Sequence, residues 1–209
     1  MLKTKIYETL LNHYAMHQQN ADGKVEITLY PRNYDGSANL DVGYKLINND
    51  MNTWKLLKVE RGQEMKIGEF EEETTGLLGL YIIAEGQLYK LPVDQRVRES
   101  LACIDDDMDA VKSILEQQIH PKYFSADIEK EDAINLCKDQ GKYSVYYLFK
   151  SGEKIFFSKG RPLNSASIIA YNFCLLLKKF DEFFDQWGSE LDITQTEIDK
   201  VKKVYFGKN

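Results

Sequence analysis

The stretch KVEITLY, residues 24–30, alternates apolar and polar side chains, and this alternation decides the class of the fold. Its apolar residues occupy every second position, at Val25, Ile27 and Leu29. Because successive side chains of a strand point to opposite faces, the pattern is typical of a strand with one buried face, as in antiparallel sheets. Pro31 ends the run, since proline cannot donate a hydrogen bond to a neighbouring strand.

Further strand-like runs lie on the C-terminal side and are separated by short polar turns. They cover residues 40–47, 53–60 and 64–70. The next run, LLGLYIIAEGQLYKL at residues 77–91, has a polar centre, AEGQ at residues 84–87, that is typical of a tight hairpin between two apolar strands. Strands that follow one another through short turns predict an antiparallel meander.

A helix is expected on the N-terminal side of the sheet. Apolar and aromatic residues recur there at helical spacing, at Leu2, Ile6, Leu10 and Tyr14, followed by His17. We therefore predict an amphipathic helix over residues 2–18, ended by the turn NADG at residues 20–23. Such a helix would lie against the meander.

The pattern changes period after Pro92. A short helix at Val97 and Leu101 and a second helix over residues 105–119 predict a helical connector. The segment that follows predicts a ββα-containing module: a helix over residues 127–140, strands over 142–149 and 154–158, a long helix from Asn164 or Ser165, and a last helix capped by Thr194.

The fold class predicted from these patterns is α+β. An N-terminal helix on an antiparallel meander takes residues 1–92, the helical connector takes residues 93–125, and the C-terminal module takes residues 126–209. The three segments can also pack as a single domain, and the patterns leave this alternative open.

Composition and charge limit the classes of function. Of the 209 residues 43% are hydrophobic, which is enough for a core, and the net charge of −6 disfavours binding to nucleic acid. Three distant cysteines, Cys103, Cys137 and Cys174, form no pattern for a disulfide framework or a zinc site. Glu8 and Asn12 interrupt the N-terminal apolar residues, and no apolar run is long enough to span a membrane. These features predict a cytoplasmic protein that binds neither membrane nor nucleic acid.

A basic group, Lys159, Gly160 and Arg161, lies between a predicted strand and the start of the long helix. The unpaired N–H groups at a helix start favour anions, and arginine can hold a phosphate or carboxylate with two donors. Alternatively, Gly160 only supplies a positive φ and both basic chains are solvated. If the group has a functional role, the sequence favours contact with a partner protein at least as much as contact with a phosphate.

Two other clusters invite a functional interpretation. His13 and His17 would lie one turn apart on a helix, a spacing that can bind zinc, but the glutamate of the HExxH motif is absent, so we expect no metal site. Asp105, Asp106 and Asp107 open a predicted helix, where the macrodipole favours negative charge, and they could also contact a basic partner.

Catalytic and cofactor motifs are missing from the sequence, which contains no GxSxG, GxGxxG or GxxxxGK[ST]. We therefore predict no cofactor and favour a function other than catalysis. One strand carries aromatic side chains on both faces, and a surplus tyrosine such as Tyr146 would suit contact with a partner protein.

Two hypotheses remain. The first is an acidic protein that binds another protein, such as an immunity or inhibitor protein that neutralises a basic toxin; opposite charges would speed the association. The second is a small enzyme or ligand-binding domain that holds an anionic group at Lys159 and Arg161. The sequence names neither the partner nor the oligomeric state.

Overall fold

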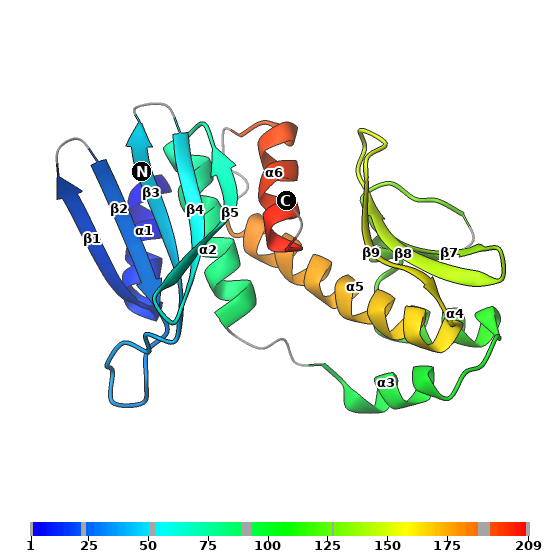
Figure 1. Ribbon diagram of the computed structural model, residues 1–209. Helices are drawn as coiled ribbons and strands as arrows, with labels where there is room; N and C mark the ends of the chain where they lie inside the picture. The colour runs from blue at the N-terminus through cyan, green and yellow to red at the C-terminus, as the bar shows by residue number, and fades with distance from the viewer. Residues whose placement is uncertain are drawn as a thin grey trace. The chain divides into compact units, whose positions relative to one another are not determined.

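The computed structural model describes residues 2–21, 24–50, 53–88, 93–126, 128–187 and 193–207 and shows an α+β fold, as predicted. The chain divides into two compact units (Figure 1). Unit 1 contains residues 1–90 and 182–209, and unit 2 contains residues 91–181. The domain boundaries predicted after residues 92 and 125 stay a prediction, since compact units need not be independent domains.

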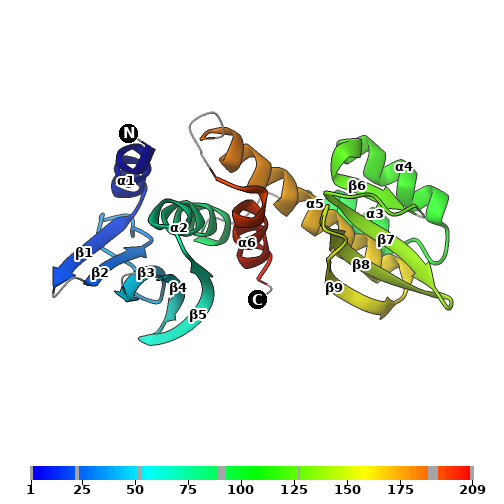
Figure 2. The ribbon, with the colours of Figure 1, turned by 90° about the horizontal axis from the view of Figure 1, so that it is seen from above.

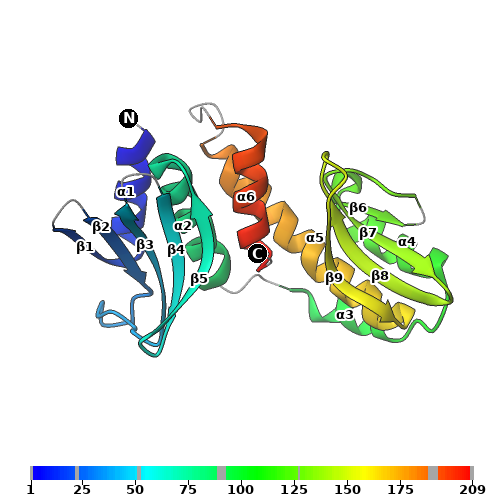
Figure 3. The ribbon, with the colours of Figure 1, turned by 45° about the horizontal axis from the view of Figure 1, so that its top comes forward.

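Unit 1 contains a five-stranded antiparallel sheet whose strands follow one another in chain order (Figure 3). The strands are β1 (Ala15–Ala21), β2 (Lys24–Tyr30), β3 (Val42–Asp50), β4 (Thr53–Glu60) and β5 (Gln63–Phe70). The alternation in residues 24–30 places Ile27 opposite Leu46, and Leu46 opposite Leu56, with all three fully buried. The predicted meander is therefore present.

Three helices lie on one side of this sheet: α1 (Leu2–His13), α2 (Glu73–Leu88) and α6 (Gln195–Tyr205) (Figure 2). The predicted cap of α6 is confirmed. The Glu197 N–H donates to Thr194 Oγ1 at 3.3 Å, and the Thr194 N–H donates to Glu197 Oε2 at 2.8 Å. This reciprocal capping box fixes the start of the last helix.

The hairpin predicted within residues 77–91 is wrong, because residues up to 88 of this run belong to helix α2; residues 89–91 lie outside the described residues. Eleven of its residues are buried, since the sheet, α1 and α6 all pack around it. A helix that is apolar on every side has no amphipathic period, so the sequence could not separate it from a pair of buried strands. Gly86, which we interpreted as a turn residue, instead lies against the ring of Tyr205.

The N-terminal helix is shorter than predicted and ends at His13 instead of residue 18. The polar residues that follow form β1, which pairs with β2 along its whole length, from Ala15 opposite Tyr30 to Ala21 opposite Lys24. A strand at the edge of a sheet tolerates polar side chains on both faces, so β1 has little apolar alternation to reveal it. Residues 22 and 23 of the predicted NADG turn lie outside the described residues.

Unit 2 contains a mixed four-stranded sheet in the order β6–β7–β8–β9. Its strands are β6 (Phe124–Ala126), β7 (Ala133–Asp139), β8 (Lys142–Leu148) and β9 (Lys154–Arg161). The two predicted strands are confirmed as β8 and β9, but the helix predicted over residues 127–140 is wrong for residues 128–140; residue 127 lies outside the described residues. Residues 133–139 of that stretch form β7, which pairs in parallel with β6 and antiparallel with β8.

The helices of unit 2 are α3 (Gln95–Ala102), α4 (Met108–Gln118), the short 3₁₀ helix η1 (Pro121–Tyr123) and most of α5 (Leu163–Asp185). The rings of Phe157 on β9 and Phe173 on α5 stack with centroids 3.6 Å apart, so α5 covers one face of the sheet. The end of α5 belongs to unit 1, where Phe183 and Trp187 pack edge-on against Tyr81. In the part of the chain that the structure describes, no helix combines the length and the apolar character that crossing a membrane requires.

Buried and half-buried tyrosines of unit 1 should make the protein sensitive to alkali. Burial, together with nearby glutamates, raises the pKa of Tyr7, Tyr44 and Tyr81 from 10.0 to about 12. A phenol whose pKa is higher in the folded than in the unfolded protein stabilises the fold at pH values below the unfolded-state pKa of about 10. This stabilisation is lost as the pH rises from about 10 towards the folded-state pKa of about 12. In a titration followed by tyrosinate absorbance, we expect a late group of tyrosines that titrates near pH 10 only after denaturation. Tyr44→Phe should remove one member of that group, and ionisation of all tyrosines near pH 10 in the native protein would contradict the prediction.

Candidate functional site

The predicted basic group lies at the end of strand β9, not in a turn between strand and helix. Lys159 and Arg161 are exposed, and the Lys159 Nζ lies 3.8 Å from the ring centroid of Phe156. Gly160 has a φ of +65°, the conformation for which glycine is suited. Helix α5 begins at Leu163, so the basic residues immediately precede a helix start, as predicted. Their role in binding an anion stays a prediction.

The predicted acidic group is divided among three environments. Asp106 accepts a hydrogen bond from the Tyr143 hydroxyl at 2.6 Å and pairs with Lys138 at 3.2 Å, and these partners lower the pKa of its carboxyl. Asp107 caps α4 by accepting from the Ala110 N–H at 3.0 Å. Asp105 is exposed. Two of the three carboxylates thus have structural partners within the chain, and their contact with a partner protein stays a prediction.

Tyr146, the predicted partner contact, is only 3% exposed. Its hydroxyl donates to Glu129 Oε1 at 2.5 Å and lies 3.2 Å from the Cys137 Sγ. Lys154 pairs with Glu129 and places its ammonium 4.7 Å from the Tyr146 ring centroid. Burial, followed by the cysteine and glutamate neighbours, raises the pKa of Tyr146. Tyr146 therefore contributes mainly to a polar cluster that holds residue 129 over the sheet.

The two histidines that would share a helix lie on different elements, so this expectation was wrong. His13 is the last residue of α1, and His17 lies on β1, opposite Thr28. The His13 Nδ1 is 2.9 Å from Glu85 Oε1. Among the described residues, no group of three or more histidine, cysteine, aspartate or glutamate side chains could hold a metal ion.

The sequence interpretation gave no functional role to the loop between β2 and β3, residues 31–41, which we call the β2–β3 loop. It projects beyond the ends of these strands (Figure 1). Tyr34 near its tip is fully exposed, and Leu40 at its end is 63% exposed. Burying a tyrosine of this kind in an interface would remove a large apolar surface from water, and tyrosine is enriched at interface centres.

Hydrogen bonds within the β2–β3 loop fix its conformation. The Asn33 N–H donates to the Ser37 carbonyl at 2.8 Å, and the Asn39 N–H donates to the Pro31 carbonyl at 2.8 Å. Asp35 Oδ1 accepts from both the N–H and the hydroxyl of Ser37, at 2.9 and 2.6 Å. These bonds, with the hydroxyl contributing most, lower the pKa of Asp35 and keep it charged. The loop therefore presents Tyr34 beside a carboxylate.

Arg32 attaches the β2–β3 loop to the C-terminal end of helix α1 and to Tyr14, which follows this helix. Its guanidinium donates to the carbonyls of Tyr14 at 2.7 Å and Leu11 at 3.2 Å, and also to Gly36 within the loop at 3.4 Å. A loop that is braced in this way loses little conformational entropy on binding, which favours affinity. The signal in the sequence is the run of Asn, Asp and Ser around Tyr34, because such side chains bond to nearby backbone groups and fix turns.

The negative charge of the chain lies mainly in unit 1, which carries the β2–β3 loop. Unit 2 contains 14 acidic and 13 basic residues, whereas unit 1 contains 19 acidic and 14 basic residues. The predicted acidic contact at residues 105–107 thus belongs to the nearly neutral unit. Long-range attraction of a basic partner would act chiefly on unit 1.

Comparison of this chain with models of protein families, with curated proteins and with solved structures gives no significant match.

Proposed function

We propose that this protein binds another protein of basic character and neutralises it, as an immunity or inhibitor protein does. The observation that carries the proposal is the fully exposed Tyr34 on a loop fixed by its own hydrogen bonds. A rigid loop that displays one large aromatic side chain has the form of a binding anchor, since it offers apolar area at low entropic cost.

Charge supports the basic character of the partner. Asp35 and Asp41 flank Tyr34 and Leu40 in the loop, while the one basic side chain of the loop, Arg32, is used to anchor it. A lysine or arginine of a partner can stack on an exposed tyrosine ring and pair with an adjacent carboxylate at the same time. The surplus of acidic residues in unit 1 would add long-range attraction that weakens with salt.

The test compares immobilised wild type with Tyr34→Ala in a lysate of the cells that make the protein, at low and moderate salt. We expect one basic protein to be retained by the wild type and its affinity to fall by about 10- to 100-fold in the variant, as at an interface hot spot. Ile128→Ala is the matched control, because it also removes an exposed apolar side chain (77% exposed), but from unit 2. Adding the protein to its purified partner at equal concentration should abolish the activity of that partner.

Asp35→Asn separates the role of charge from that of shape. The amide can still accept the bonds from Ser37, so the loop should keep its form while the association rate falls and depends less on salt. The proposal fails if the retained protein is acidic, if Tyr34→Ala retains it as well as Ile128→Ala does, or if its activity is unaffected.

A further inference from the structure

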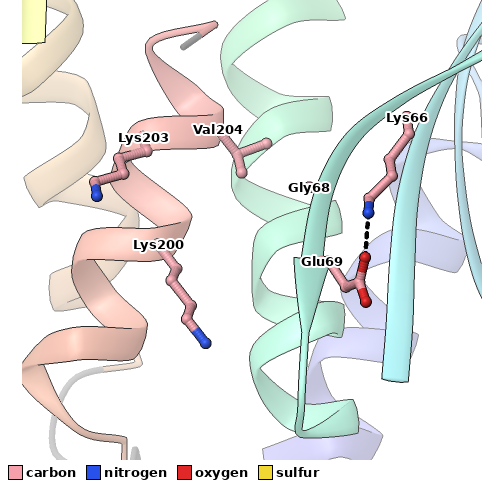
Figure 4. Close-up of a pocket in the computed structure, with 6 residues that line it drawn as sticks. All are labelled: Lys66, Gly68, Glu69, Lys200, Lys203 and Val204. Carbon is pink, nitrogen blue, oxygen red and sulfur yellow. Dashed lines mark hydrogen bonds and ion pairs between the residues drawn. The ribbon is translucent and has the colours of Figure 1, made fainter. Parts of the chain in front are cut away.

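Unit 1 contains a hollow of about 360 Å³ between strand β5 and helix α6. Six residues line it, three from the strand and three from the helix: Lys66, Gly68, Glu69, Lys200, Lys203 and Val204 (Figure 4). Its volume is within the range of sites for small molecules, and most of its exposed lining is apolar. It lies at an edge of the sheet, since β5 is the last strand in the order.

Two local features of β5 shape this hollow. Leu56 pairs with Gly68 but Leu57 pairs with Lys66, so Ile67 is an extra residue, a β-bulge that changes the direction of the neighbouring side chains. Gly68 lets α6 approach, because a Cβ atom at this position would lie 2.8 Å from Val204 Cγ2. The strand and the helix therefore meet at a glycine and a valine, and these residues form an apolar floor.

Lysines lie on both the strand and the helix beside this floor, although Lys203 extends away from β5 (Figure 4). Lys66 pairs with Glu69 on the strand side, and Lys200 extends from the helix toward β5, with its Nζ 3.1 Å from Glu71 Oε1 (Figure 4). An ammonium has three donors, and a single carboxylate does not use them all. The Lys200 pair is solvent-exposed, so it contributes little stability and can be exchanged for a ligand at little cost.

We infer that this hollow binds a small carboxylate with an apolar body, a site separate from the β2–β3 loop. The carboxylate pairs with Lys200, and with Lys66 where the ligand reaches the strand side, while the apolar body covers Gly68 and Val204. Charge alone would attract any anion, but an apolar floor gives additional free energy only to a ligand that buries carbon against it. Because the ligand contacts both β5 and α6, binding stabilises the packing of the last helix.

The test measures thermal unfolding and amide chemical shifts of the full chain with sodium hexanoate, acetate, phosphate and chloride at equal ionic strength. Hexanoate should raise the Tm with concentration, with a Kd on the order of 1 mM, and should shift the amide signals of Gly68 and Val204. Acetate and phosphate should have much smaller effects. Lys200→Ala should weaken hexanoate binding by about tenfold, whereas Lys142→Ala, which removes an exposed lysine from unit 2, should leave it unchanged.

Three results would overturn the inference. An equal response to phosphate or acetate would show a charge effect without an apolar subsite. Unchanged hexanoate binding in both Lys200→Ala and Lys66→Ala would show that neither lysine binds the carboxylate. An amide signal of Gly68 that does not shift would show that the ligand binds elsewhere. None of these results affects the proposed protein partner, since Tyr34 takes no part in the hollow.

Discussion

Replacing Gly86 by alanine should destabilise the protein by about 2–3 kcal/mol, although alanine is the better helix former by about 1 kcal/mol. The reason is steric. A Cβ atom at residue 86 would lie 2.2 Å from Cε2 and 2.9 Å from Cζ of Tyr205. Tyr205 is fully buried on α6, so its ring cannot turn into solvent, and α6 would have to move away from α2. Urea unfolding followed by circular dichroism would show the loss as a lower midpoint.

Gly76→Ala is the matched control, because it makes the same change in the same helix. Its Cβ atom would lie 3.2 Å from both Leu46 Cδ1 and Trp54 Cβ, a tight contact that a shift of a few tenths of an ångström relieves, so the loss of stability should be about 1 kcal/mol or less, well below that of Gly86→Ala. The difference between the two variants isolates the contact with Tyr205. Equal effects, or a Gly86→Ala protein as stable as wild type, would contradict this account of how α6 packs.

The same contact explains why the sequence led to a hairpin at this position. Gly86 lies in an apolar run beside the polar Glu85, and this combination is typical of a turn. The structural reason for a glycine at this position is the ring of Tyr205, which lies more than a hundred residues away in the sequence. The residues next to Gly86 give no information about such a distant partner. Strands with one solvated face could be predicted from the local sequence. Burial on one face requires apolar residues at every second position, and this alternation in residues 24–30 and 53–60 predicted the bounds of β2 and β4.

In the candidate sites too, contacts between residues close in the sequence could be predicted, and contacts between distant residues could not. Asp107 as a helix cap follows from its neighbours, and the structure places it there. That Asp106 would instead bond to Tyr143 and Lys138 depends on how α4 and the sheet meet in unit 2. Tyr34 was predictable in part, since its turn residues indicate a loop, but the bonds from Arg32 to α1 that brace this loop are long-range.

The other large effect is expected from Asn135, a fully buried polar residue on β7. Its Oδ1 accepts from the Lys130 N–H at 2.7 Å, and its Nδ2 donates to the carbonyls of Lys130 and Ala133, each at 2.9 Å. Asn135→Ala removes three hydrogen bonds at once and leaves their backbone partners unsatisfied, so we expect a loss of about 3 kcal/mol in the free energy of unfolding. Urea unfolding measures it.

Ser125→Ala is the control for Asn135, because it removes one bond to the same segment, from the Ser125 hydroxyl to the Ile128 carbonyl at 2.6 Å, at an exposed position. Its cost should be under about 1 kcal/mol, since water replaces the lost partner.

Hydrogen exchange at the Lys130 amide gives a second readout, because only Asn135 accepts from this N–H in the bonds described above. Faster exchange there, with the amides of α5 unchanged, would show that Asn135 fixes residues 128–132 and thereby positions Glu129 beside Tyr146. A loss below about 1 kcal/mol together with unchanged exchange would mean that the segment is fixed by its other contacts, such as the pair between Glu129 and Lys154.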